Sequence, residues 1–404
     1  MSTPTTTRLK DGQLRNLLIA TLASTIGFWG WTMIGPLSKY YVTHLHLSTG
    51  QISTLVAMPV IVGSVARIPA GALTDRYGGR VMFTAILGLT APLVALTGLI
   101  GAGGSYAGLL AVSFLLGVAG TVFSVGIPFC SDWYESHRKG FATGVFGAGM
   151  VGTAVSAFVT PRLKEALGYL PTHFLVAGIV LAMAAASWLL LRDSPVWAER
   201  EPAPMLPRLK EAFTLKVTYQ MCFLYAIIFG AFVAFSNYLP TYLGNVYGFD
   251  ATGAGTRTAG FALAAVLARP VGGSLADRFG PRLITWISFA GVIVFAAILA
   301  FQPAEERHFG PMWVALAVSI GLGTGGVFAW VSRAAPAKAA GTISGVIAAA
   351  GGLGGYFPQL YMGATYDAAE ASYFVGLMTL AVFTLAGLVL TFWVRHGGRP
   401  GAEG

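Results

Sequence analysis

Polar and charged residues interrupt this chain at regular intervals and leave about twelve apolar stretches between them. Each stretch has roughly 20 residues, the length that an α-helix needs to cross the hydrocarbon core of a bilayer. The pattern predicts membrane helices over residues 14–36, 51–73, 81–101, 106–130, 140–161, 170–191, 215–239, 253–275, 282–302, 310–332, 340–364 and 370–394. We therefore expect an all-α, multi-pass membrane protein.

The composition supports this class. Hydrophobic residues make up 55% of the chain, charged residues only 10%, and the mean hydropathy is +0.70. So few charges could not cover the surface of a soluble domain. The first apolar stretch, Leu14 to Ile34, is too long for the core of a signal peptide and has no small-residue cleavage site after it, so we expect it to be retained as a helix. The two cysteines, Cys130 and Cys222, both fall in apolar stretches and predict neither a disulfide nor a metal site.

Basic residues are distributed unevenly between the two sides of the predicted bundle. If both termini are cytoplasmic, 18 arginines and lysines lie inside and five lie outside, namely Lys39, Arg162, Lys164, Arg257 and Arg307. This bias is the positive-inside signal of a membrane protein, and it accounts for the net charge of +9 without a nucleic-acid partner. We expect a protein of the cytoplasmic membrane, surrounded by lipid, with both termini cytoplasmic.

The chain also contains a repeat. One long polar segment with four prolines, residues 192–214, lies between the sixth and seventh predicted helices. It divides the chain into two predicted six-helix halves, residues 1–191 and 215–404. In the first half the chain reads Gly71-Ala-Leu-Thr-Asp75-Arg76-Tyr-Gly78-Gly-Arg80. In the second it reads Gly273-Ser-Leu-Ala-Asp277-Arg278-Phe-Gly280-Pro-Arg282, displaced by 202 positions in a chain of 404. Internal repeats of this kind are typical of secondary transporters.

The repeated decapeptide resembles the loop signature of the major facilitator superfamily, which implies two six-helix halves. We expect Asp75 and Asp277 to accept from N–H groups at a neighbouring helix end, and Arg76 and Arg278 to bind carbonyls or carboxylates. Such contacts would stabilise one conformation at the cytoplasmic end. The alternative is a plain turn that carries inside positive charge.

Two arginines stand inside apolar stretches, where an unpaired charge costs several kcal/mol and indicates a functional site. Arg67 and Arg269 each precede an aspartate of the repeat by eight residues, about 12 Å of helix, which places both near the middle of a core of about 30 Å. The acidic residues fall in loops or at predicted helix ends, so a structural pairing would leave two buried cations uncompensated. A bound planar oxyanion would neutralise them and fit the guanidinium fork.

The segments Ala66-Arg67-Ile-Pro-Ala-Gly-Ala-Leu-Thr-Asp75 and Ala268-Arg269-Pro-Val-Gly-Gly-Ser-Leu-Ala-Asp277 resemble the arginine helices of the nitrate/nitrite porter family. Its glycine-rich stretches also have counterparts, and the resemblance covers nearly the whole chain. These counterparts are Gly147, Gly149 and Gly152 in the fifth predicted helix, and Gly351, Gly352, Gly354 and Gly355 in the eleventh.

The resemblance implies that one arginine from each half binds nitrate or nitrite between aromatic rings. Tyr225 and Phe229 match the family's tyrosine and phenylalanine, Phe123 matches a further ring, and Phe28 matches loosely. Where the family commonly has asparagines, this chain has Phe146, Met150 and Thr324. The glycine pairs at offset 202 favour a role in rocking one half on the other, and static helix packing is the alternative.

No Asp, Glu or His falls at mid-membrane depth, so the sequence offers no proton relay through titrating side chains. An empty site with two desolvated like charges should resist closure, which favours obligatory nitrate/nitrite exchange by a monomeric carrier. Proton-coupled nitrate uptake, with the proton carried by water or Tyr225, stays open, and so does an organic-anion or drug carrier of the same superfamily. We expect neither an enzyme nor a cofactor, since no nucleophile with a nearby base, phosphate loop or metal cluster is recognisable.

Overall fold

The computed structural model describes residues 4–135, 138–198, 205–334 and 340–394, which form helices, turns and one isolated bridge between Asp367 and Ser372. The elements up to the predicted linker are α1 (Pro4–Trp31), η1 (Gly35–Leu37), α2 (Ser38–Leu45), α3 (Thr49–Val65), α4 (Arg67–Tyr77), α5 (Gly79–Ala102), α6 (Tyr106–Leu116), η2 (Gly117–Thr121), α7 (Val122–Asp132), α8 (Lys139–Gly147), η4 (Ala148–Val151), α9 (Gly152–Leu167) and α10 (Tyr169–Leu190).

The predicted linker contains two short helices, α11 (Pro195–Ala198) and α12 (Met205–Thr214). The later helices are α13 (Lys216–Tyr247), α14 (Ala251–Phe279), α15 (Pro281–Ala300), α16 (Glu306–Ala334), α17 (Ala340–Gly354), α18 (Tyr356–Ala364) and α19 (Phe374–Leu390).

Nine helices within the described residues are long and apolar enough to cross a membrane, and α3 with α4 makes a tenth if the bent pair is one span. The predicted stretch 340–364 is divided into α17 and α18, and 370–394 contains α19 with 17 residues. The predicted total of twelve spans therefore stays a prediction.

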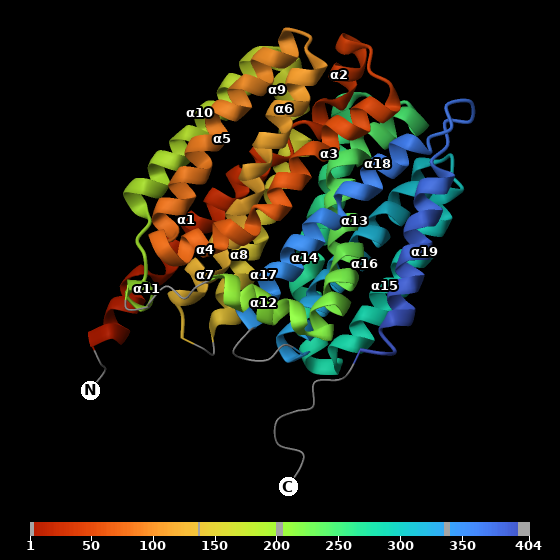
Figure 1. The fold of residues 1–404 in the computed structure, drawn as a ribbon. Helices are drawn as coiled ribbons and strands as arrows, with labels where there is room; N and C mark the ends of the chain where they lie inside the picture. The colour runs from red at the N-terminus through yellow and green to blue at the C-terminus, as the bar shows by residue number, and fades with distance from the viewer. Residues whose placement is uncertain (1–3, 136–137, 199–204, 335–339, 395–404) are drawn as a thin grey trace.

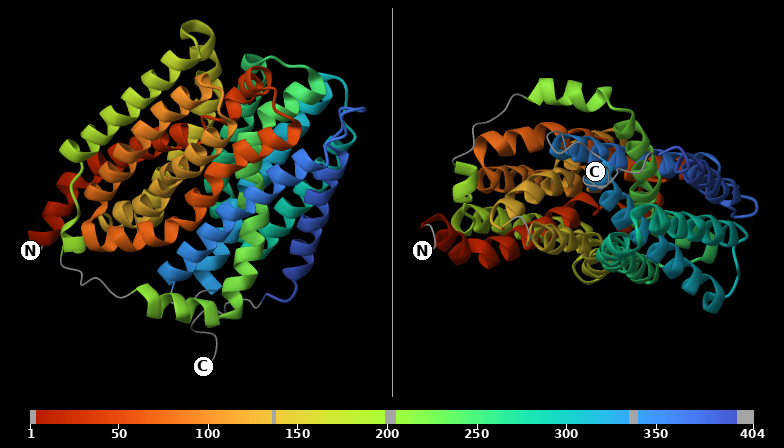
Figure 2. Two further views of the ribbon diagram at one scale, coloured as in Figure 1. Left: turned by 45° about the horizontal axis from the view of Figure 1, so that its top comes forward. Right: turned by 90° about the horizontal axis from the view of Figure 1, so that it is seen from below.

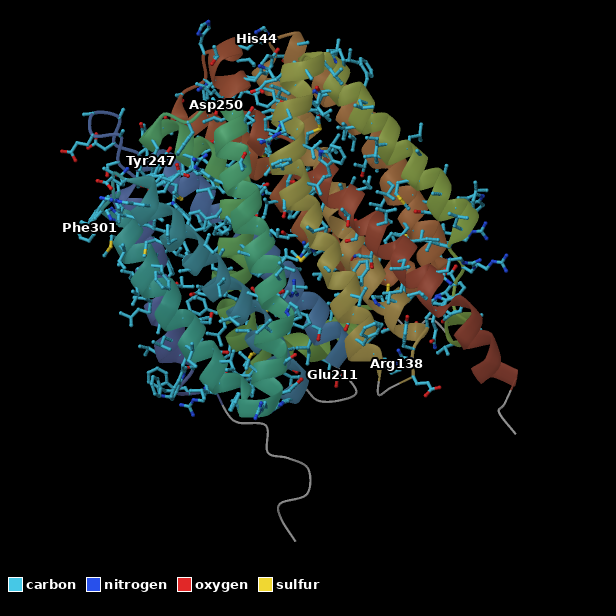
Figure 3. The ribbon with its side chains drawn as sticks, turned by 180° about the vertical axis from the view of Figure 1, so that it is seen from behind. His44, Arg138, Glu211, Tyr247, Asp250 and Phe301 are labelled. Atoms are coloured by element: carbon cyan, nitrogen blue, oxygen red, sulfur yellow. The ribbon has the colours of Figure 1, made fainter. Side chains whose placement is uncertain are left out.

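The helices before the linker lie on one side of the molecule and those after it on the other (Figures 1 and 2). The beginning of α1 and the end of α19 lie toward the same end (Figure 1). Arg138 and Glu211 also lie at that end, whereas His44 and Asp250 lie at the opposite one (Figure 3). We refer to these as the predicted cytoplasmic end and the predicted outer end.

The position of a proline explains the bend between α3 and α4. α3 ends at Val65 and α4 begins at Arg67, with a bend of 42° between them. Pro69 lies just after this junction and has no N–H to donate to the carbonyl four residues earlier, which weakens the helix at that point. The second half differs, since Pro270 follows Arg269 directly and α14 continues through it as one helix. The bend places Arg67 at the first turn of a new helix.

Close contacts join the two sides of the molecule at the predicted outer end. Arg162 Nη2 on α9 donates to Thr256 Oγ1 on α14 at 3.0 Å, and Thr252 Oγ1 donates to Glu165 Oε1. The backbones also approach closely, because a Cβ added at Gly255 would lie 2.3 Å from the Ala157 carbonyl oxygen. A Cβ added at Gly35 would lie 2.3 Å from the Asn237 carbonyl oxygen. These glycines permit helices of the two sides to touch.

The repeated decapeptides lie at the predicted cytoplasmic end. Arg333 Nη2 donates to Asp277 Oδ1 at 3.1 Å, and Trp197 Nε1 donates to the carbonyl of Asp75 at 3.1 Å. Arg76 lies over Tyr77 and Arg278 over Phe279, at 5.3 and 5.1 Å from the ring centroids. Each of these contacts stays within one predicted half or reaches the linker. A role for the four residues in stabilising one conformation stays a prediction.

Candidate anion-binding site

The two arginines that the sequence places at mid-membrane depth face the same pair of rings. The Cζ atom of Arg67 lies 5.7 Å from the Phe123 centroid and 5.5 Å from the Phe229 centroid. The Cζ atom of Arg269 lies 5.4 and 5.7 Å from the same two centroids. Two cations 202 positions apart thus share one aromatic site between the two sides of the molecule.

Arg67 is the more buried of the pair, with 2% of its surface exposed. Its Nη1 donates to the Ala348 carbonyl on α17 at 3.0 Å. Its Nε and Nη2 are buried and have no hydrogen-bond partner within the described residues. An unsatisfied buried donor costs about 1–3 kcal/mol, and more when it is charged. These two N–H groups therefore point to an acceptor supplied by a ligand.

Arg269 is held by neutral groups. Its Nη2 donates to Tyr225 Oη at 3.0 Å, and its Nη1 contacts Met150 Sδ at 3.0 Å. Its Cζ also lies 5.9 Å from the Phe328 ring. The contacts described for Arg67 and Arg269 thus consist of a carbonyl, a phenol, a thioether and rings, none of which carries a full negative charge. An anion between them would supply the missing charge.

The aromatic residues predicted for the site surround the arginines. Tyr225 and Phe229 stack one helical turn apart on α13, with centroids 5.1 Å apart and ring planes 5° apart. Phe28 lies edge-on to Phe123 at 6.3 Å, and its other described ring contact is Trp31 at 5.5 Å. Phe28 therefore supports Phe123, whereas Phe123 and Phe229 face the guanidinium groups.

Glycines on α17 let this helix approach the site. A Cβ added at Gly351 would lie 2.2 Å from Tyr225 Cδ1. A Cβ added at Gly352 would lie 2.3 Å from Ser64 Oγ and 3.5 Å from Arg67 Nη1. Real side-chain carbons do not come this close, so both positions require the absence of a side chain. The glycine-rich stretch thereby brings the Ala348 carbonyl within reach of Arg67.

The remaining predicted glycines lie mostly at contacts inside one half. Added Cβ atoms at Gly149 and Gly152 would meet Ser24 and Thr25 of α1, and those at Gly354 and Gly355 would meet Ala226 and Val233 of α13. Gly147 has no neighbour within 4 Å of an added Cβ. Of the seven, Gly352 is the one that meets the opposite half, at Ser64. Their predicted role in rocking stays a prediction.

The three positions where the family commonly has asparagine differ in what they contact. Phe146 is fully buried and lies 5.9 Å from Phe123, Met150 contacts Arg269, and Thr324 Oγ1 donates to the Ile320 carbonyl of its own helix at 2.6 Å. Only Met150 therefore meets an arginine.

Sequence reasoning missed three residues at the site. Trp31 lies 6.0 Å from Arg67 Cζ, Phe328 lies beside Arg269, and Ser64 Oγ is buried without a described partner. Spacing held the signal for Trp31, which follows Phe28 by three residues on the same helix face, whereas Ser64 and Arg67 belong to α3 and α4 on either side of the bend.

Comparisons with known proteins identify the family. A family model described as Major Facilitator Superfamily matches residues 20–358. The chain is 51% identical over 393 residues to the probable nitrate/nitrite transporter NarK2 of Mycobacterium tuberculosis H37Rv, covering 97% of this chain and 98% of that protein. This chain belongs to the nitrate/nitrite porter family of the major facilitator superfamily. It is 34% identical over 421 residues to the probable nitrate/nitrite antiporter NarK1 of Thermus thermophilus, covering 96% of this chain and 92% of that protein.

The fold agrees with this family assignment. A solved bacterial homologue of the human lysosomal transporter Spinster superposes with a TM-score of 0.73 at 18% identity, covering 98% of this chain and 97% of that one. This porter is therefore a multi-pass membrane transporter and not an enzyme.

Proposed function

We propose that this porter carries nitrate and nitrite across the membrane, one anion at a time, between Arg67 and Arg269. The names of the two relatives, a nitrate/nitrite transporter and a nitrate/nitrite antiporter, support the substrate class. The observation that carries the proposal is the convergence of the two guanidinium groups on Phe123 and Phe229, with two buried donors of Arg67 unsatisfied.

The chemistry of the site fits a small planar oxyanion. Nitrate has three oxygens in one plane, and a guanidinium group presents parallel N–H donors in one plane, so the two can pair bidentately. Phe123 and Phe229 each face both cations, so a flat ligand held by the two guanidinium groups would lie against apolar ring faces. Tyr225 Oη accepts from Arg269, so its own proton is directed elsewhere and is available to the anion.

We propose obligatory exchange as the transport mode. Without a ligand, two desolvated cations repel one another, and closing the site removes the water that screens them. With nitrate or nitrite bound, one charge is neutralised and the unsatisfied donors of Arg67 gain acceptors. The carrier should therefore change conformation when loaded and resist the change when empty. The described partners of both arginines include no carboxylate or imidazole, which disfavours a proton relay at this site.

In this proposal the two six-helix halves rock around the site in the cytoplasmic membrane of a bacterial cell. We propose that both termini face the cytoplasm, so that the contacts of Arg162 and Gly255 lie at the end that faces out. One chain contains both arginines, so a monomer suffices for transport.

The experiment is uptake of isotopically labelled nitrate into proteoliposomes that contain the purified full chain. The lumen holds nitrite, nitrate, an inert anion, or an inert anion with an imposed pH gradient. The proposal predicts uptake only into nitrite-loaded or nitrate-loaded vesicles. Uptake driven by the pH gradient alone would refute exchange and favour proton symport.

The same assay tests the two arginines. Arg67→Lys should abolish exchange, because an ammonium group lacks the bidentate fork. The matched control is Arg138→Lys, which changes an exposed arginine at the predicted cytoplasmic end and should leave exchange unchanged. Exchange retained in Arg67→Lys would contradict the site.

A further inference from the structure

Ser64, at the end of α3, carries a hydroxyl group beside the anion site that the proposed exchange does not yet use. The side chain is fully buried, and its Oγ has no hydrogen-bond partner within the described residues. Other buried hydroxyls donate to a carbonyl of their own helix, as Thr74 Oγ1 does to the Ala70 carbonyl at 2.7 Å. Ser64 makes no such bond, so its proton is available to another acceptor.

Ser64 and Arg67 approach the same glycine of α17. The position that a Cβ would take at Gly352 lies 2.3 Å from Ser64 Oγ and 3.5 Å from Arg67 Nη1. Because Gly352 has no side chain, the hydroxyl and the guanidinium group can share this side of the site. A guanidinium group has five N–H donors and no acceptor, so Arg67 cannot accept the proton of Ser64.

Several donors on the Arg67 side of the site therefore lack an acceptor. They are the Ser64 hydroxyl and the Nε and Nη2 groups of Arg67, all of them buried and without a partner in the part of the chain that the structure describes. Leaving a buried donor unsatisfied costs free energy. An oxyanion has lone pairs on every oxygen, so it can accept from the hydroxyl as well as from the guanidinium group.

The internal repeat does not reproduce this arrangement at Arg269. The positions equivalent to Ser64 and Gly352 are Val266 and Met150, each displaced by 202 residues. Val266 has no hydroxyl, and Met150 Sδ contacts Arg269 Nη1 at 3.0 Å. The side chain that is absent at Gly352 is thus present at Met150, and it fills the place beside the second arginine with a thioether. The two sides of the site therefore differ in the donors that they offer.

Nitrate and nitrite carry the same charge and differ by one oxygen, so charge alone cannot distinguish them. The two oxygens of nitrite can accept from one guanidinium group each. The third oxygen of nitrate needs a further donor, and a site that supplies one disfavours the ligand that leaves this donor unpaired. We propose that the Ser64 hydroxyl donates to nitrate beside Arg67 and thereby favours nitrate over nitrite. This inference rests on the proposed function and adds the residue that distinguishes the two anions.

The test is isothermal titration calorimetry of sodium nitrate and, separately, of sodium nitrite into the purified full chain. Ser64→Ala removes the hydroxyl and keeps a small side chain. It should weaken nitrate binding about tenfold, which corresponds to about 1.4 kcal/mol, and leave nitrite binding within about twofold of wild type. The ratio of nitrate affinity to nitrite affinity should thus fall by about fivefold or more.

Ser113→Ala is the matched control, because Ser113 is another fully buried serine whose Oγ has no described partner. Ser113 lies on α6, ten residues before Phe123 along the run of α6, η2 and α7, which is about 15 Å of helix. In this variant both affinities should stay within about twofold of wild type. Monodisperse elution checks that each variant is folded.

An unchanged affinity ratio in Ser64→Ala, whether both affinities fall equally or neither falls, would overturn this inference and leave the proposed anion site standing. An equal fall of the ratio in Ser113→Ala would also overturn it. Wild type that binds neither anion would refute the proposed function, and the inference with it. If Ser64→Ala does not fold, Ser64→Cys takes its place, because a thiol is close in size and a weak donor. The ratio should fall in that variant too, and a ratio equal to wild type would overturn the inference.

Discussion

Removing the hydroxyl of Tyr225 tests how the phenol contributes to anion binding. Tyr225 is fully buried, and its Oη accepts from Arg269 Nη2 at 3.0 Å. The variant Tyr225→Phe keeps the ring that stacks on Phe229 and deletes one oxygen. Arg269 loses an orienting acceptor, and the anion loses the phenol as a donor.

The expected change in the apparent KM of Tyr225→Phe follows from this hydrogen bond. A hydrogen bond to a charged group contributes about 1.5–3 kcal/mol, and about 1.4 kcal/mol corresponds to a tenfold change in affinity. Water has little access to a fully buried phenol, so the loss should approach that range. We expect the apparent KM for nitrate exchange in proteoliposomes to rise at least tenfold in Tyr225→Phe.

Tyr219→Phe is the control on the same helix. Tyr219 is 57% exposed and donates to the Phe213 carbonyl, outside the anion site, so its KM should stay within twofold of wild type. A KM change below twofold in Tyr225→Phe would refute the reasoning. Loss of the maximal rate at unchanged KM, together with loss of pH-driven uptake, would assign Tyr225 to proton transfer instead.

Three further outcomes follow from other contacts. Gly352→Val should lower nitrate exchange at least tenfold in proteoliposomes, because its Cβ would meet Ser64 Oγ at 2.3 Å and overpacking costs about 1–3 kcal/mol, whereas Gly147→Ala, with open space around it, should not. Met150→Leu conserves volume and removes only a weak thioether acceptor, so its KM should rise by less than that of Tyr225→Phe; an equal rise would show that the sulfur matters more than its chemistry suggests. Burial raises the pKa of Asp193, so the folded state binds a proton more readily than the unfolded state. The free energy of unfolding therefore falls as the pH rises from the ordinary carboxyl pKa through the raised pKa. The Tm of Asp193→Asn minus that of wild type should therefore shrink as pH is lowered toward the ordinary carboxyl range, and a difference independent of pH would contradict the assignment.

The sequence predicted the long spans well because apolar length is their dominant signal, but it could not predict where helices extend or break. The predicted stretch 215–239 is part of α13, which continues to Tyr247, since a helix satisfies its own backbone in water as well as in lipid. The helix breaks at Ala66, next to a proline, and changes to a 3-10 helix at Ala148–Val151, among glycines. Proline and glycine also occur inside continuous helices, so tertiary packing decides which of them interrupts a helix.

At the site, the repeat predicted that Arg67 and Arg269 reach one depth, and helical spacing predicted the Tyr225–Phe229 pair. The amino-acid sequence could not predict that Arg67 binds a backbone carbonyl of α17, because every residue has a carbonyl and the side chains do not show which one is within reach. The sequence also did not single out Gly35 and Gly255 as contacts between the two sides, because the residue type involved is too common. Glycines are frequent throughout the chain, and only the packing of the two sides distinguishes those that touch across the interface.

The central claim is that both arginines bind one anion together. Isothermal titration calorimetry of nitrate into the purified full chain, in a buffer of a large inert anion, tests it directly with wild type, Arg67→Lys and Arg269→Lys. The account predicts one nitrate per chain for wild type and no measurable binding for either variant. Binding of wild-type affinity in either single variant would contradict it.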